Sequence, residues 1–213
     1  MNNINKLVWI GITALLLALP TPSLGQGPKL VTPPGDIELE IVGQVQNVPM
    51  TTISNQYGYV SAINGLDNVF SAPPHNETTA FFTFYTEAHT NSVINNGKLR
   101  IVNRTGTTTI YQDDVPNGNF ADPDTFRDGT PILTMTLKQQ VILDLVENTF
   151  TTVNINTVVS ISSFTFGGQE LRLGQASDQF RTVINGRAND TGTPAGFVIA
   201  GYVVPIGKQT GEN

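Results

Sequence analysis

The stretch FFTFYTEAHT, residues 81–90, holds the side chains in this chain that come closest to acid/base chemistry, including one of its only two histidines. On a β-strand alternate residues share a face, so Tyr85, Glu87 and His89 would point the same way. If that face lines the inside of a barrel, Glu87 could orient and charge His89 as a base, with Tyr85 as a proton donor. If the intervening phenylalanines form the buried face instead, Glu87 and His89 lie in solvent.

Two later arginines, Arg172 and Arg181, are candidates for binding a ligand. Both lie on or near short segments with the pattern of strands. An inward guanidinium could hold an anionic ligand, whereas an outward one would be an ordinary surface charge. The sequence alone leaves both orientations open.

The longest irregular stretch, residues 113–130, is rich in aspartate. Asp122, Asp124 and Asp128, followed by Gly129, supply the hard oxygen ligands that Ca²⁺ takes in proteins. Their spacing does not match an EF-hand, which needs acids at alternate positions and a closing glutamate. Calcium is therefore one hypothesis for this loop, a solvated loop made of turn residues is the other, and no other cofactor is indicated.

Several function classes are disfavoured by what the sequence contains. There is no G-x-S-x-G, H-E-x-x-H or P-loop motif, and there is no cysteine. The chain has 11 basic and 17 acidic residues, a net charge of −6, and its lysines and arginines are scattered. Since phosphate binding needs clustered basic residues, we expect no nucleic-acid partner.

The first 25 residues have the pattern of an export signal. Lys6 supplies the positive charge, an apolar run extends from Leu7 to Leu19, and small residues Ser23 and Gly25 precede a plausible cleavage point. The apolar run is shorter than the ~20 residues that span a bilayer. We therefore predict a periplasmic or extracellular protein, without membrane insertion after cleavage, that begins with a flexible leader at residues 26–36.

The remaining chain alternates apolar and polar residues. Odd-numbered positions are apolar through most of the run from Leu133 to Leu145, and Val153, Ile155, Val159 and Ile161 continue the same pattern. A period of two predicts β-strands whose odd residues face a core. A helix over residues 132–146 is the alternative, because some of these apolar residues also fit helical spacing.

About 8–10 such strands joined by short turns predict an all-β domain over residues 37–206, followed by a disordered tail at residues 207–213. A single antiparallel meander barrel is favoured because closure removes exposed sheet edges, and a two-sheet β-sandwich is the alternative. In general shape this pattern resembles the barrels of lipocalins, allene oxide cyclase and dirigent proteins. The Gly-x-Trp motif of lipocalins is absent, since the only tryptophan, Trp9, lies in the signal, and no family is assigned.

The leading functional hypothesis is an exported, non-catalytic barrel that binds a small apolar molecule or a surface partner. One alternative is a cyclase or isomerase that uses Tyr85, Glu87 and His89 inside the barrel. Another is a structural or adhesive surface protein.

Overall fold

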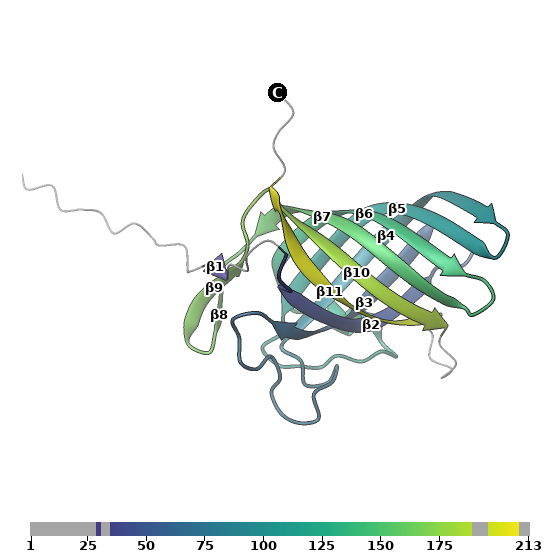
Figure 1. Ribbon diagram of the computed structural model, residues 1–213. Coiled ribbons are helices and arrows are strands. Elements are labelled where there is room, and N and C mark those ends of the chain that lie inside the picture. Colours follow the sequence, from purple (N-terminus) through teal and green to yellow (C-terminus); the bar gives the residue numbers. More distant parts are fainter. Residues whose placement is uncertain (1–28, 31–34, 189–195, 209–213) are drawn as a thin grey trace, which may run out of the picture.

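The computed structural model describes residues 29–30, 35–188 and 196–208. Eight strands form a closed antiparallel barrel, in which each barrel strand pairs with the next along the chain and the last pairs with the first (Figure 1). They are β2 (Leu39–Asn47), β3 (Ile53–Ile63), β4 (Phe82–Asn96), β5 (Leu99–Gln112), β6 (Thr130–Asp144), β7 (Thr149–Ile161), β10 (Asp178–Ala188) and β11 (Phe197–Lys208). The predicted all-β meander barrel is confirmed, and the sandwich alternative is wrong.

The segment from 132 to 146 is not a helix, because residues 130–144 form β6, which pairs with β5 and β7 along its length. Its odd residues point into the barrel, and Leu133 and Leu137 are almost completely buried. The period of two therefore predicted this strand and its inward face correctly.

Along most of β7 the inward face is opposite to the one predicted, whereas Ile161, beyond a bulge in the pairing with β6, lies opposite the inward Leu133 and packs against the core as predicted. Val153 and Val159 are 41% and 55% exposed, whereas Val158 is 2% exposed. The cause is the β6–β7 turn, which pairs Leu143 with Phe150 and so places an odd residue opposite an even one. Residues that face each other across a ladder share a side of the sheet, so the inward set changes from odd to even numbers.

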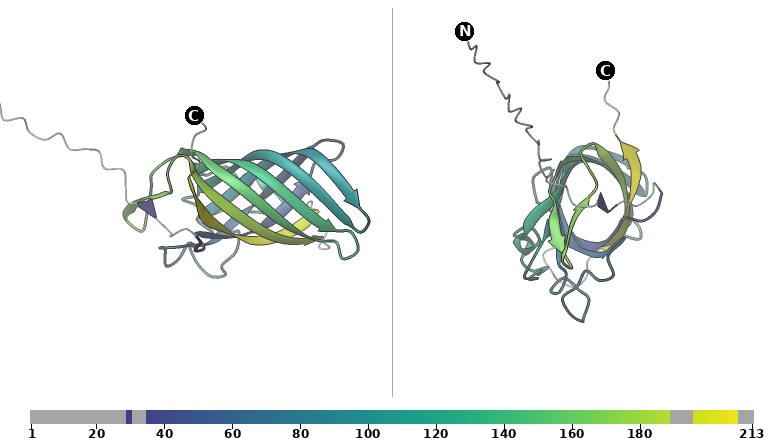
Figure 2. Two further views of the ribbon diagram at one scale, coloured as in Figure 1. Left: turned by 45° about the horizontal axis from the view of Figure 1, so that its top comes forward. Right: turned by 90° about the vertical axis from the view of Figure 1, so that its left-hand side faces the viewer.

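One end of the barrel is sealed by a small sheet with strand order β1-β9-β8 (Figures 1 and 2). Its strands are β1 (Lys29–Leu30), β8 (Phe164–Phe166) and β9 (Gln169–Leu173). The ring of Phe164 packs edge-on against Phe82 at a centroid distance of 5.6 Å, and Leu173 is 1% exposed. Apolar packing therefore fills this end.

The outer surface near the sealed end is covered by the loops at 64–81 and 113–129 (Figure 1). The second loop contains the short 3₁₀ helix η1 (Pro123–Phe126), and the two loops are joined where the Asp113 N–H donates to the Phe81 carbonyl at 2.8 Å. Phe126 is fully buried against the ring of Tyr57 on β3, at a centroid distance of 5.6 Å. This loop is thus packed on the barrel wall.

The two ends of the chain are described only in part. The predicted signal at 1–25 and most of the leader lie outside the described residues. At the other end β11 includes Gly207 and Lys208, which had been assigned to the tail, while 209–213 lie outside the described residues. Within the described part of the chain, no helix has the length and apolar character needed to cross a membrane.

The reversed face of β7 can be tested with the same substitution at two adjacent residues. Val158→Ala should lower the free energy of unfolding by about 2 kcal/mol, because it removes buried methyl groups and leaves a cavity. Val159→Ala, on the exposed side, should change it by less than about 1 kcal/mol. Urea unfolding followed by circular dichroism measures both, and a larger loss at Val159 would contradict the assigned faces.

Candidate functional site

The middle of the barrel interior is lined by amide and hydroxyl side chains. Four strands contribute Gln56 (β3), Gln139 (β6), Asn154 and Asn156 (β7) and Thr182 (β10), each at most 5% exposed. We call this set the amide belt. A buried amide is costly unless its hydrogen bonds are made, so the belt must pair internally.

The amide belt does pair internally. Gln56 and Gln139 exchange two amide hydrogen bonds, of 3.1 and 3.2 Å, and the Gln139 amide nitrogen also donates to Asn154 Oδ1 at 3.1 Å. Asn156 Nδ2 donates to Thr182 Oγ1 at 2.8 Å. Because both Gln139 donors are used by neighbouring amides, the side chain of Gln139 is fixed with its oxygen turned toward β5.

That oxygen accepts a hydrogen bond from an arginine inside the barrel. Arg104 on β5 donates from Nη1 to Gln139 Oε1 at 3.1 Å, from Nη2 to Asn47 Oδ1 at 3.3 Å and from Nε to Thr90 Oγ1 at 3.3 Å. Burial lowers the pKa of the Arg104 guanidinium below its ordinary value, but an arginine remains cationic at neutral pH. No carboxylate of the described residues forms an ion pair with it.

Above the amide belt, toward the end of the barrel opposite the small sheet, lies a cavity of about 170 Å³. Gln56, Gln139 and Arg104 form its polar side. Its remaining wall is mainly apolar, formed by Val45, Val102, Val141, Leu143, Phe150, Ile184, Phe197 and Ile199, with Asn47, Arg100 and Thr152 among them. The spaces deeper in the barrel measure only about 30 and 10 Å³, so this cavity is the main one inside the described barrel.

Two aromatic rings stand at the mouth of the cavity. Phe150 and Phe197 contact edge to face at a centroid distance of 5.3 Å. Phe150 lies across the backbone of Gly186, where a Cβ atom would be 2.2 Å from the ring, so a larger residue at this position would force the ring to move. A wider hollow of about 580 Å³ adjoins the mouth on the outer surface, but it is open to solvent and desolvates a ligand less well than the enclosed cavity.

The predicted acid/base residues lie on the opposite side of the wall. Glu87 and His89 are on the outer face of β4, with side chains 55% and 50% exposed and a Glu87 Oε1–His89 Nε2 distance of 3.5 Å. The two do meet, as the shared face of a strand requires, but in solvent. Of the two alternatives that the sequence left open, the structure therefore has the one in which Glu87 and His89 lie in solvent, and the interior placement is wrong.

Tyr85 shares that outer face but is covered by the 113–129 loop. Its ring stacks on Tyr57 at 6.1 Å, and the Arg127 guanidinium lies 4.6 Å from its centre. Burial raises the pKa of the Tyr85 hydroxyl above its ordinary value, which Arg127 only partly offsets. Tyr85 is therefore a packed, neutral residue that anchors the loop.

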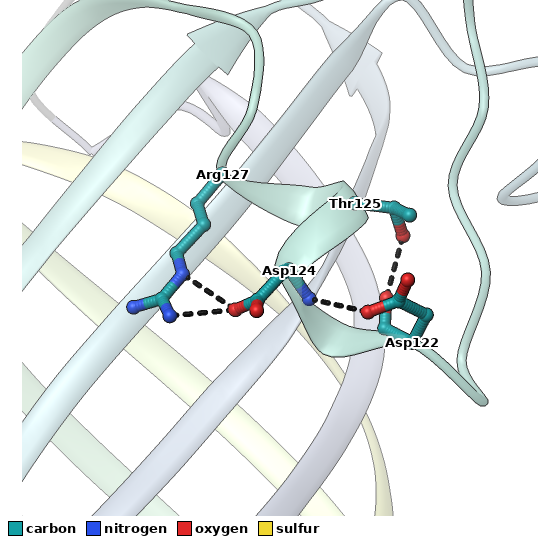
Figure 3. A network of polar contacts seen from close by, with 4 residues as sticks. All are labelled: Asp122, Asp124, Thr125 and Arg127. Carbon is teal, nitrogen blue, oxygen red and sulfur yellow. Dashed lines mark hydrogen bonds and ion pairs between the residues drawn. The ribbon is translucent and has the colours of Figure 1, made fainter.

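The three aspartates proposed as calcium ligands have separate local partners, and Figure 3 shows those of Asp122 and Asp124. Asp122 caps η1 by accepting from the Asp124 N–H at 3.3 Å, and Asp124 forms an ion pair with Arg127 at 2.6 Å. Asp128 accepts from Asn117 Nδ2 at 2.8 Å. Among the residues that the structure describes, no three acidic or histidine side chains gather as a metal-binding group. Calcium binding here stays an untested prediction.

The two arginines singled out from the sequence do not line the cavity. Arg181 is exposed on the outer face of β10, and Arg172 lies on β9 in the small sealing sheet. The arginine inside the barrel, Arg104, was missed, together with Gln56 and Gln139. The sequence held one signal for a polar interior, which is the run of polar residues at even positions of β7. Once the valines between them are placed outside, these polar residues must face the inside of the barrel.

Comparisons of the chain with protein-family models, with curated proteins and with solved structures found no match.

We predict that the hydrogen-bonded members of the amide belt stabilise the barrel as a coupled group. Gln139→Leu should lower the free energy of unfolding by about 1–3 kcal/mol, because Gln56, Asn154 and Arg104 each lose a buried partner. Gln56→Leu combined with Gln139→Leu should cost less than the sum of the two single changes, since neither glutamine is then left facing a lost partner. Gln140→Leu, on the exposed face, is the control, and strict additivity in urea unfolding would contradict a coupled network.

We predict that ionisation of Asp113, a buried carboxyl group on the outer loop, makes the stability of the protein depend on pH. Burial raises the pKa of Asp113 above its ordinary value of 3.8, so ionising this carboxyl costs the folded protein stability as the pH rises above that value. Asp113→Asn keeps a side-chain oxygen that can accept the hydrogen bond from the Val115 N–H, and the asparagine side chain is uncharged at every pH. The variant should be more stable than the parent protein at pH 7, and the difference should shrink below about pH 4.

Thermal melts at several pH values measure this effect, with Asp114→Asn at the exposed neighbouring position as the control. An advantage of the Asp113 variant that grows on acidification would be the opposite of what we expect.

Proposed function

We propose that this barrel is a binding protein that takes a small, largely apolar molecule into the cavity at the end opposite the small sheet. The observation that carries the proposal is the shape and chemistry of that cavity: mainly apolar walls, a polar side held rigidly by the amide belt, and one sealed end. Small-molecule sites are typically concave and apolar, with a few fixed polar groups that orient the ligand.

The size of the cavity limits the ligand. Apolar protein cavities of ~150 Å³ are large enough to hold benzene, so about 170 Å³ suits a single ring or a short branched chain. Phe150 and Phe197 at the mouth offer flat apolar surfaces to any part of the ligand that projects outward. The ligand we propose is therefore smaller than a long-chain lipid.

The cyclase or isomerase alternative has less support. It depended on Tyr85, Glu87 and His89 acting inside the barrel, and these residues lie on its outer wall. The amide belt offers glutamine, asparagine and threonine in their place, and these are hydrogen-bonding groups that do not titrate near neutral pH. Binding without turnover is the function that this interior fits best.

Filling the cavity should abolish binding. Calorimetric titration with toluene should show saturable binding to the protein, and Val141→Phe should weaken it about tenfold or more because the new ring occupies the ligand's space. Val153→Phe makes the same change on the outer face and should leave the affinity unchanged. Both variants are first checked for a cooperative thermal unfolding transition.

Absence of saturable toluene binding to the parent protein would reject the proposal. Equal affinity in the parent and in a folded Val141→Phe protein would also reject it, because the ligand would then bind elsewhere.

A further inference from the structure

We infer that the ligand carries an anionic oxygen group, a carboxylate on a small apolar body, and that Arg104 binds it. The inference rests on the proposed function, because it concerns which molecule the cavity selects. It starts from the position of the Arg104 guanidinium, which lies on the polar side of the cavity rather than on the outer wall.

The hydrogen bonds of Arg104 leave capacity for a ligand. A guanidinium has five N–H donors, and three are used, by Thr90, Asn47 and Gln139. Two of these bonds are 3.3 Å long, well beyond the ~2.7–2.9 Å of a charge-assisted pair with a carboxylate. No described residue accepts a hydrogen bond from the remaining two donors, and the Arg104 side chain lines the cavity.

The charge of Arg104 is not matched by the protein around it. All three acceptors are neutral side chains, and no carboxylate of the described residues pairs with it. A cation in a partly buried, mainly apolar site gains most from an anion placed beside it. The planar fork of a guanidinium also matches the two oxygens of a carboxylate.

Arg104 is held in place before any ligand arrives. Gln139 presents its oxygen to Nη1, and Gln139 is itself fixed by Gln56 and Asn154. Because the guanidinium is already oriented, a ligand loses less free energy in ordering it. The same network sets the side of the cavity at which the anionic group must sit.

The rest of the cavity argues for a small monoanion. Its wall is mainly valine, leucine, isoleucine and phenylalanine, which favour an apolar body over a second charge. Arg100 lies near the rim, where its Nε donates to Asn95 at 3.0 Å in an exposed position. The chain carries a net charge of −6, so its overall field repels anions at a distance. The preference for an anionic ligand therefore depends on the contacts with Arg104 inside the cavity.

The test compares ligands that share one ring and differ in charge. Calorimetric titration of the intact protein with benzoate, benzyl alcohol and benzylamine should show benzoate binding about 10–100-fold more tightly than benzyl alcohol, with benzylamine weakest. In Arg104→Gln the benzoate-to-benzyl-alcohol ratio should fall to near one, and in Arg104→Lys it should lie between, because the charge stays but the fork is lost. Arg181→Gln, on the exposed outer face, should keep the ratio of the parent protein.

A second measurement does not require the variants to fold. In ¹⁵N spectra of the parent protein, benzoate should shift the Arg104 Nε–H resonance, and benzyl alcohol should shift it less. Equal affinities for benzoate and benzyl alcohol, or an unchanged ratio in folded Arg104→Gln, would overturn the assignment of an anionic ligand while leaving the proposed binding function standing. Binding of none of the three ring compounds, nor of toluene, would overturn the binding function itself.

Discussion

Closure of the sheet is the constraint on which the rest of this structure depends. Each of the eight barrel strands is hydrogen-bonded on both sides, including the closing pairs β7–β10 and β11–β2. A strand paired on both sides cannot shift by one residue without turning its whole inward set outward. Closure therefore decides, residue by residue, which side chains meet inside and which face solvent.

The inside set divides into three zones along the barrel axis. At the sealed end phenylalanine and leucine side chains pack under the small β1-β9-β8 sheet. In the middle hydrogen bonds between side chains join the members of the amide belt, and above it a mainly apolar wall surrounds the cavity. The polar zone explains how an arginine is kept inside, because one of its donors meets the oxygen of Gln139, which Gln56 and Asn154 already hold in place.

The alternation of residue types was enough to predict the strands but not their orientation. The run from Leu133 to Leu145 identified β6 and its buried face, because apolar residues alone occupy the inside of that strand near the sealed end. On β7 the inside residues include Asn154 and Asn156, while Val153 and Val159 are outside. Hydropathy places such valines in the core by default, and only the pairing of Leu143 with Phe150 reverses that assignment.

The candidate site was hidden for the same reason. Glu87 and His89 drew attention because titratable pairs are typical of catalysis, yet their face of β4 lies outside. Arg104 lies in a mostly polar part of the sequence, where no alternation of apolar and polar residues shows which side chains face inward. Its importance appears only when β3, β5 and β6 bring Gln56, Arg104 and Gln139 together, across separations of up to 83 residues. Contacts of that range are set by register, which a single sequence does not show.

The most direct test of this account is where a small apolar molecule contacts the protein. Intermolecular nuclear Overhauser effects from the ring protons of bound toluene should reach the methyl groups of Val102, Val141 and Ile184, which line the cavity. Contacts to the methyl groups of Val153 and Val159 instead would place the ligand on the outer wall. That result would contradict both the assigned inward faces and the cavity as the binding site.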